Sequence, residues 1–486
     1  MRVTKTRRPF LLFLTLALVL AFAHLEDPSE HSTVLAAQAQ AGVDPTSAAE
    51  SPAGHGEEHT SPVSLILISL VVILMTAKVG GDLFERMHQP AVLGELVFGV
   101  LIGNLGLLGI TGLDYLKSNE VISVLAEIGV IFLLFEVGLE SNIKEMLEVG
   151  LSSFLVALFG VVAPMLLGLG VGRYFLPEAH PLVPVFIGAT LCATSVGITA
   201  RVLKDLGKIN GKESRIILGA AVIDDVMGLV ILAAVSGIIK AANRGGSAIS
   251  VLDIGIITLK AIAFLVVAIW VGSRLSPRLF GLASRLRVRG MLLATSVSFC
   301  FVLAYLANRI ELAPIVGAFA AGLILDPVHY VDFRDRGEHH LEELLLPITS
   351  FLVPIFFVLM GIRVDLRTFG HLEILSFAGI LSLAAIVGKQ VCSLGVMEKG
   401  LDRFSVGIGM IPRGEVGLIF AGIGTTLVLN GAPVISSSTY SAVVIMVIVT
   451  TLVTPPLLKW SLAKGERRKQ QHQVQGAPSE LKGQRR

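Results

Sequence analysis

Two adjacent aspartates, Asp224 and Asp225, lie inside an otherwise apolar run from Ile216 to Val235. A run of this length and composition is typical of a membrane-spanning helix. An ionisable side chain in such a helix is costly, and it usually faces a water-filled cavity or a partner of opposite charge. The two carboxylates therefore predict a site for a cation or a proton. The alternative is a solvated helix end that only resembles a span.

Lys389 lies deep in another apolar stretch, Ile380–Cys392. Its ammonium group is too far from either end of the stretch to reach the membrane surface, so we expect a carboxylate partner. Consecutive helical residues point about 100° apart, so Asp224 and Asp225 cannot face the same way. We expect one aspartate to pair with Lys389 and the other to line the cavity. The alternative role for Lys389 is a purely structural salt bridge.

Two more apolar segments contain residues that interrupt a regular helix. The first has small and hydroxyl residues at mid-depth, among them Thr194 and Ser195, and the second contains Pro-Arg-Gly-Glu at 412–415. Non-helical backbone at this depth is tolerated only against protein or water. Its freed carbonyls and the two hydroxyls could hold a cation. Alternatively, Thr194 and Ser195 serve close helix packing, and Arg413 and Glu415 simply neutralise each other.

The composition indicates a polytopic membrane protein rather than a soluble enzyme of similar length. Of the 486 residues, 53% are hydrophobic and only 16% are charged, and the mean hydropathy is +0.78. The three cysteines lie in apolar stretches and imply no disulfide framework. No nucleophile arrangement, metal-ligand spacing or phosphate-binding loop indicates an enzyme or a bound cofactor.

Thirteen apolar segments of spanning length predict an all-α fold of about thirteen transmembrane helices. Most lysines and arginines fall in alternate connections and in the C-terminal tail, which predicts that the N-terminus lies outside and the C-terminus in the cytoplasm. We therefore expect a multi-pass protein of the inner (plasma) membrane. The segments are 62–80, 91–110, 120–138, 149–173, 182–203, 215–240, 250–273, 290–308, 312–326, 346–362, 372–396, 404–429 and 436–460.

Composition divides the chain into four parts. Residues 1–39 have the pattern of a signal peptide or signal anchor, with basic residues, an apolar run and then small residues. Residues 40–61 predict a disordered extracytoplasmic linker, whose cluster His55–His59 either binds a metal or belongs to the flexible linker. Residues 62–462 are the predicted transmembrane domain, and residues 463–486 are a basic cytoplasmic tail.

A weak internal repeat relates the two halves of the chain. The second segment has Gly94 and Gly99 after a proline, and the ninth has Gly317 and Gly322 at the same spacing after a proline. The two copies are seven segments apart, an odd number, so they must be inverted relative to each other. The same pairing makes the fifth and twelfth segments counterparts, and these are the two interrupted ones.

Five stretches carry a resemblance to a known family: Gln89–Leu96, Leu125–Phe135, Ala193–Leu203, Val222–Asp225 and Met410–Ile419. In colinear order, they resemble the monovalent cation:proton antiporters of the CPA2 type, most closely the NapA-like sodium/proton antiporters. The resemblance implies thirteen helices divided into a dimerisation and a core subdomain, with two broken helices that cross in the core. It also implies a homodimer that works by an elevator-like movement of the core.

Carried over residue by residue, the resemblance implies that Asp225 is the main carboxylate for both the cation and the proton. It implies that Asp224 is the partner of Lys389. In the mechanism that we expect, Asp224 also binds the sodium ion when it releases Lys389. These roles agree with the different directions that adjacent aspartates take on one helix.

The resemblance also assigns the interrupted segments. Thr194 and Ser195 match the break of the first crossing helix, and Arg413 and Glu415 match the break of the second. Relatives of the Kef type usually carry a nucleotide-binding regulatory domain, whereas only a short polar tail follows the last span here. We therefore expect no such domain and no nucleic-acid partner.

Together these features predict a secondary antiporter that exchanges Na⁺ or Li⁺ for H⁺, with monovalent cations, protons and the lipid bilayer as its partners. A second proton, released from Lys389 when Asp224 binds sodium, would make the exchange electrogenic. Exchange of K⁺ for H⁺ is the closest alternative, because the sequence does not fix the size of the cavity. A sodium-coupled organic-anion symporter would need further polar residues for its solute, and an ion sensor would need a soluble output domain.

Overall fold

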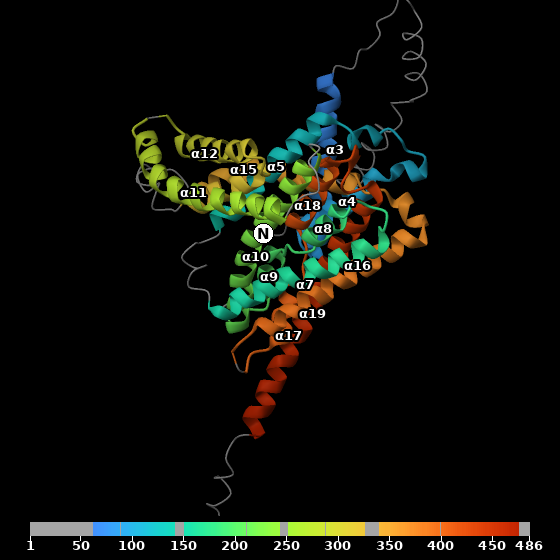
Figure 1. Cartoon of the computed structure of the whole chain (residues 1–486), viewed down its shortest axis with the longest axis vertical. Coiled ribbons are helices and arrows are strands. Elements are labelled where there is room, and N and C mark those ends of the chain that lie inside the picture. Colours follow the sequence, from blue (N-terminus) through green and yellow to red (C-terminus); the bar gives the residue numbers. More distant parts are fainter. Residues whose placement is uncertain are drawn as a thin grey trace, which may run out of the picture. The chain divides into compact units, whose positions relative to one another are not determined.

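The computed structural model is almost entirely helical (Figure 1), which confirms the predicted fold class. The predicted leader (1–39) and linker (40–61) lie outside the described residues, as does the end of the predicted tail from residue 476. The structure describes residues 62–87, 89–140, 150–209, 211–243, 251–286, 288–325, 340–398 and 400–475.

The helices follow the predicted segments closely. The α-helices are α3 (Pro62–Arg86), α4 (Ala91–Gly103), α5 (Glu120–Glu140), α7 (Leu151–Phe175), α8 (Leu182–Thr190), α9 (Val196–Asp205), α10 (Lys212–Asn243), α11 (Val251–Ala283), α12 (Met291–Arg309), α13 (Pro314–Ile324), α15 (Leu341–Ile362), α16 (Leu372–Gln390), α17 (Arg403–Gly409), α18 (Glu415–Thr426) and α19 (Ser437–Gln475). The short elements are η1 (Leu105–Leu108), η2 (Asp114–Lys117), η4 (Leu366–Gly370), η5 (Val391–Gly395) and the antiparallel pair β1 (Val428–Leu429) and β2 (Ala432–Pro433).

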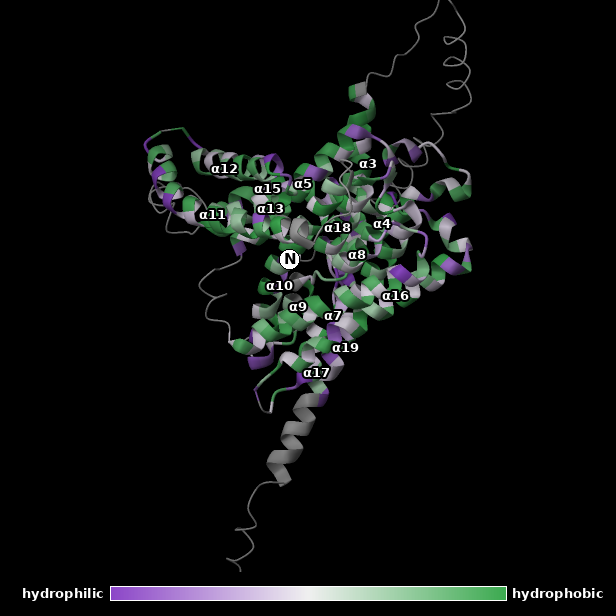
Figure 2. Cartoon of the chain, viewed as in Figure 1, coloured by the Kyte–Doolittle hydropathy of each residue, from purple (hydrophilic) through white to green (hydrophobic). Residues whose placement is uncertain are grey.

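Nine helices in the described part of the chain are long and apolar enough to cross a membrane. The other four predicted spans are shorter or broken: α4 and α13 are short, and two segments are each divided into half-helices, α8 with α9 and α17 with α18. Hydrophobic residues predominate along helices such as α10, α11 and α12 (Figure 2). A multi-pass membrane protein is therefore supported, while the total of thirteen crossings stays a prediction.

The chain forms two compact units. The first contains the described residues up to Glu127 together with Pro354–Val364. In this unit the backbones of α3 and α4 are in direct contact. A Cβ added to Gly94 would lie only 2.1 Å from the carbonyl oxygen of Gly80. The α4 backbone packs equally closely on the end of α15. There a Cβ added to Gly99 would lie 2.3 Å from the carbonyl oxygen of Val358.

The second unit contains Ile128–Val353 and the chain from Asp365 onward, and it repeats these contacts. A Cβ added to Gly317 of α13 would lie 2.1 Å from the carbonyl oxygen of Leu303 on α12. A Cβ added to Gly322 would lie 2.2 Å from the carbonyl oxygen of Phe135 on α5. The paired glycines of the predicted repeat thus have the same role in both units. Because they lack a side chain, the backbone of a neighbouring helix can approach closely.

Within the second unit, α10 occupies a central position. It packs against α7, α8, α9 and α17, and α7 packs in turn against α8 and α16 (Figure 1). The apolar core between α7, α10, η5 and α17 includes Val156, Ala157, Ile217, Ala220, Ala221, Cys392, Val406 and Met410. This core fixes α10, and therefore its two aspartates, between the two broken segments.

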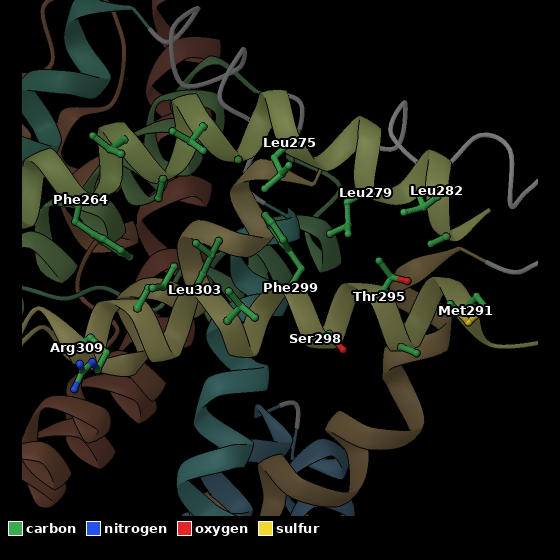
Figure 3. Close-up of a pocket in the computed structure, with 18 of the residues that line it drawn as sticks. Phe264, Leu275, Leu279, Leu282, Met291, Thr295, Ser298, Phe299, Leu303 and Arg309 are labelled. Carbon is green, nitrogen blue, oxygen red and sulfur yellow. The ribbon is translucent and has the colours of Figure 1, made fainter. Parts of the chain in front are cut away.

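An apolar groove of about 810 Å³ lies between α11 and α12 (Figure 3). Leu275, Leu279 and Phe299 line it, and Arg309 is its only charged lining residue. Exposed apolar side chains on these helices, such as Trp270, are expected where lipid replaces water around a protein. The groove contains no carboxylate, so it is not the predicted cation site.

Candidate ion-binding site

The two interrupted segments are broken at the predicted places. One half-helix ends at Thr190 and the next begins at Val196, while the other break runs between Gly409 and Glu415. Both breaks are buried, so their backbone groups need partners within the protein. The backbone amide of Ser195 donates a hydrogen bond to the carbonyl oxygen of Pro412 at 2.9 Å, which joins the two breaks directly.

Threonine hydroxyls add further links between the breaks. Thr194 Oγ1 donates to the carbonyl oxygen of Met410 at 3.4 Å, and Thr199 Oγ1 donates to that of Gly409 at 2.6 Å. Both threonines are buried. Thr194 was among the predicted site residues, but Thr199 was not. The available signal was a third hydroxyl residue close to Thr194 and Ser195 in the same interrupted segment.

Glu415 is the first residue of α18, and it accepts a hydrogen bond from Ser195 Oγ at 2.9 Å. Ser195 precedes the first residue of α9, so this bond joins the starts of two half-helices. A helix N-terminus attracts negative charge, because its first N–H groups point outward. Burial disfavours the charged carboxylate of Glu415, and its position at one such terminus, with a hydroxyl donor from the other, offsets part of that cost.

Arg413 forms no ion pair with Glu415 in the described part of the chain, so the alternative that the two residues neutralise each other is not supported. Its guanidinium is fully buried, and Nη1 donates to the carbonyl oxygen of Ala193. The Thr451 hydroxyl on α19 donates to the carbonyl oxygen of Arg413. The reason is local: Arg413 lies in the extended break and reaches across to the opposite break, whereas Glu415 has already entered α18.

Asp224 and Lys389 form a fully buried ion pair, with Lys389 Nζ 2.9 Å from Asp224 Oδ1. Gly160 of α7 covers this pair: a Cβ added there would lie 3.4 Å from Lys389 Nζ and 2.8 Å from Cys392 Sγ. This role of Gly160 could not be predicted from the sequence, because the contact depends on how α7 packs against α10 and α16.

Asp225 is also buried, with 6% of its surface exposed, but it is not held by Lys389. Its Oδ1 has no hydrogen-bond donor among the described residues. Asp224 and Glu415 are the negative groups that act most strongly on it, and Lys389 is the positive one. Asp225 therefore offers a free carboxylate oxygen in an enclosed, negatively charged place.

A family model described as sodium/hydrogen exchanger, transmembrane, matches residues 67–464. The chain belongs to this exchanger family. It is 39% identical to the high-affinity Na⁺/H⁺ antiporter NhaS3 of Synechocystis sp., over 83% of this chain and 91% of that protein. It is 37% identical to the probable Na⁺/H⁺ antiporter GerT of Bacillus cereus, over 81% of this chain and 99% of that protein.

A solved structure has the same fold as the exchanger. The sodium proton antiporter MjNhaP1 from Methanocaldococcus jannaschii, at pH 8, aligns with a TM-score of 0.61 and covers 82% of this chain and 97% of its own. Its sequence is only 17% identical, so it supports the fold alone. The expectation of a monovalent cation:proton antiporter, a transporter rather than an enzyme, is confirmed by the family. The CPA2 assignment and the homodimer stay predictions.

The charges in the exchanger's core do not balance. Among the groups at the breaks and on α10 and α16, three carboxylates (Asp224, Asp225 and Glu415) and two cationic side chains (Lys389 and Arg413) leave one negative charge in excess when these five are ionised; Glu140 on α5 also interacts with Glu415 and is not counted here. A buried excess charge is costly unless it is neutralised. One monovalent cation or one proton would neutralise it, and Asp225 has the free oxygen to receive either.

Proposed function

We propose that the exchanger moves Na⁺ or Li⁺ across the membrane in exchange for H⁺, with Asp225 as the carboxylate that carries either ion. The observation that carries this proposal is the free Oδ1 of Asp225, buried beside the two breaks and beside an aspartate already neutralised by Lys389. The names of the relatives support the choice of ion, because NhaS3 and GerT are both described as Na⁺/H⁺ antiporters.

The exchange follows from competition for one carboxylate. Protonated Asp225 has no charge with which to hold a cation, whereas ionised Asp225 attracts sodium. Sodium is a hard cation that prefers oxygen ligands. In this proposal the Thr194 and Ser195 hydroxyls and the carbonyls of the breaks supply the further oxygen ligands. The two ions therefore cannot occupy the site together. A site that opens alternately to each side then exchanges one for the other.

A second titrating group makes the exchange electrogenic in this proposal. When sodium enters, Asp224 leaves Lys389, and the ammonium of Lys389 gives its proton to water in the open cavity. Two coupled groups then release about two protons for each sodium bound. The membrane potential contributes about 2.3 kcal/mol per 100 mV for each uncompensated charge. That free energy can drive sodium out against its gradient.

The remaining parts of the proposal concern movement and placement. We place the chain in the inner (plasma) membrane as a homodimer, with the N-terminus outside and the C-terminus in the cytoplasm. Residues 62–462 supply a dimerisation subdomain and a core subdomain, and the core carries the site across the membrane as an elevator. Thr194, Ser195, Arg413 and Glu415 move with it, because they join the two breaks to each other.

Potassium is the second candidate ion. GerN of Bacillus cereus, 33% identical over 81% of this chain, is described as a Na⁺/H⁺-K⁺ antiporter, and KhtU of Bacillus subtilis, 25% identical over 68%, as a K⁺/H⁺ antiporter subunit. Potassium also prefers oxygen ligands, so the same carboxylate could serve it. The two ions differ in size, so the distances between the oxygen ligands around Asp225 would determine which ion the site prefers.

The deciding experiment is ion-driven proton movement in liposomes. Purified protein is reconstituted, and lumenal pH is followed after addition of Na⁺, Li⁺ or K⁺, for the wild type, Asp225→Asn and Asp114→Asn. Asp114 forms a half-exposed pair with Lys117 and serves as the matched control, because ion pairs in contact with solvent contribute little to stability. Exchange with Na⁺ and Li⁺ that is lost only in Asp225→Asn supports the proposal. Exchange with K⁺ alone supports the second candidate, and no exchange by folded protein refutes both.

A further inference from the structure

Gly228 is a buried glycine in the interior of α10, and neither of the usual requirements for glycine explains it. Its φ is not positive. It does not admit a neighbouring backbone either, because a Cβ added there would meet a single atom of the described residues within 4 Å, Phe420 Cζ at 4.0 Å. Glycine in a helix interior is less stable than alanine. The glycine therefore leaves a space that the packing of the core does not use.

Other buried glycines of the same unit have a clear packing role. A Cβ added to Gly188 of α8 would lie 2.6 Å from the carbonyl oxygen of Met165 on α7, and one added to Gly388 of α16 would lie 2.9 Å from the Cα of Pro164. Both would collide with backbone. At Gly228 the same methyl group would make only an ordinary van der Waals contact. Since protein interiors contain few voids, the unfilled space beside α10 needs a separate explanation.

This space lies next to the two aspartates. Gly228 follows Asp225 by three residues and Asp224 by four, so the three positions are neighbours on the surface of α10. A helical side chain leans towards the N-terminus of its helix, so any side chain at 228 would extend over the turn that carries the aspartates. Asp224 is held by Lys389, whereas Asp225 Oδ1 is buried without a donor in the described part of the chain. The unfilled space therefore borders the carboxylate that is free to bind an ion.

Phe420 on α18 bounds the space on the side opposite α10. Its side chain is fully buried, and its Cζ is the atom that a methyl group at Gly228 would approach. The same helix begins at Glu415, whose charge acts on Asp225. A buried phenyl ring is held in place by its neighbours. It therefore limits the space without supplying an oxygen ligand.

We propose that Gly228 determines the largest ion that Asp225 can bind, because it keeps free the space between this carboxylate and Phe420. This inference rests on the proposed function and adds a specificity-determining residue to the same site. A larger monovalent cation needs longer distances to its oxygen ligands, and therefore more room beside the carboxylate. A methyl group at 228 removes that room from the largest ion first, and it affects lithium, the smallest of the three ions, least.

The first test asks whether the space is unfilled. Melting temperatures are measured without Na⁺, Li⁺ or K⁺ for the wild type, Gly228→Ala and Gly379→Ala. Gly379 lies in α16, and its added Cβ would meet no atom of the described residues within 4 Å, so this control measures only the effect of alanine on a helix. We expect both variants to melt at or above the wild-type temperature. A lower value for Gly228→Ala alone would refute the unfilled space.

The second test measures the apparent KM for Li⁺, Na⁺ and K⁺ in liposomes at one pH. One methyl or methylene group changes the discrimination between similar substrates by about tenfold or more. For Gly228→Ala we expect the KM of the largest ion that the wild type exchanges to rise about tenfold relative to that of Li⁺. Gly379→Ala should show no such change. The increase in melting temperature that each ion produces should follow the same order, because a bound ion stabilises the folded protein.

Phe420→Leu supplies the reciprocal change, because it shortens the side chain that bounds the space. Combined with Gly228→Ala, it should return the ratio of KM values towards that of the wild type. An equal change for all ions in Gly228→Ala would show that the glycine serves movement or packing in another state, and it would overturn the inference. If the wild type exchanges and binds no ion, the proposed function itself is wrong. If the wild type exchanges ions and Gly228→Ala leaves the ratio unchanged, only the role of Gly228 is refuted.

Discussion

Replacing Gly160 with alanine tests how closely α7 covers the buried ion pair. The added Cβ would lie 2.8 Å from Cys392 Sγ, 3.4 Å from Lys389 Nζ and 3.7 Å from Asp224 Oδ1. A separation below 3.0 Å is essentially never seen for a real Cβ, so either α7 or Cys392 has to move. The distance to Lys389 is tight but not forbidden.

The cost depends on which group moves. Forcing an extra methyl group into a packed interior typically costs about 1–3 kcal/mol. If Cys392 turns aside, the loss stays in this range and the ion pair survives. If α7 retreats instead and water reaches Lys389 and Asp224, the loss approaches the cost of breaking a buried pair, about 3–5 kcal/mol. We expect the smaller loss, because the sulfur is the only atom inside 3.0 Å.

The assay compares denaturation midpoints in detergent with sodium-driven exchange in liposomes. Gly170→Ala is the matched control, because Gly170 lies on the same helix and its added Cβ would meet no atom within 4 Å. Alanine favours a helix by about 0.5–1 kcal/mol over glycine, so the control should be at least as stable as the wild type. Adding Cys392→Ala to Gly160→Ala should restore most of the lost stability, because it removes the sulfur. Equal stability of Gly160→Ala and Gly170→Ala would refute the close packing, and a double variant without recovery would refute the assignment to Cys392.

Three further outcomes follow from the site. Asp224→Asn leaves Lys389 buried without its carboxylate, so we expect a loss of about 3–5 kcal/mol, measured as a lower denaturation midpoint; an unchanged midpoint would count against the pair. Ser195→Ala removes a hydrogen bond to the Glu415 carboxylate, worth about 1.5–3 kcal/mol, so it should lower stability and raise the sodium KM. Ser195→Thr keeps the hydroxyl and should keep the stability and the KM of the wild type. Similar KM values for the two variants would exclude a role for the hydroxyl. In the proposed exchange two protons compete with one sodium ion, so where protons dominate, the apparent sodium KM should rise about a hundredfold for each unit by which the pH falls; a KM independent of pH would contradict competition, and a tenfold rise would indicate one proton per sodium.

The sequence was sufficient for the elements that the membrane determines. An apolar run of spanning length has few alternatives to a helix in a bilayer. Residues that interrupt such a helix, such as Pro412 and Gly414, can be recognised directly in the sequence. The structure accordingly places helices on the predicted segments and breaks on the predicted interruptions. The glycine repeat could also be predicted, because each copy uses the same spacing for the same backbone contact.

The partners of the buried polar groups could not be predicted in the same way. Arg413 and Glu415 are two residues apart, which suggested that they neutralise each other, but the backbone between them passes from an extended break into α18. Arg413 therefore donates a hydrogen bond to the carbonyl oxygen of Ala193, and Glu415 accepts one from Ser195. Thr451 is a similar case, because α19 brings it to the break from far along the chain. Such contacts depend on tertiary packing and not on local pattern.

The arrangement of charges bears on which ions the site can accept. Ser195 donates a hydrogen bond to Glu415 and Lys389 pairs with Asp224, whereas Asp225 has no ion pair among the described residues and its Oδ1 has no donor there. One negative charge is then in excess. A single proton or a single monovalent cation neutralises it, whereas a divalent cation would leave a positive charge buried beside Lys389 and Arg413, which is costly in a low dielectric. Discrimination against divalent ions therefore follows from the fixed cations, while discrimination between sodium and potassium has to come from ligand distances. The two kinds of selectivity should respond differently to mutation. Neutralising Lys389 should weaken discrimination against divalent ions and leave discrimination between sodium and potassium unchanged.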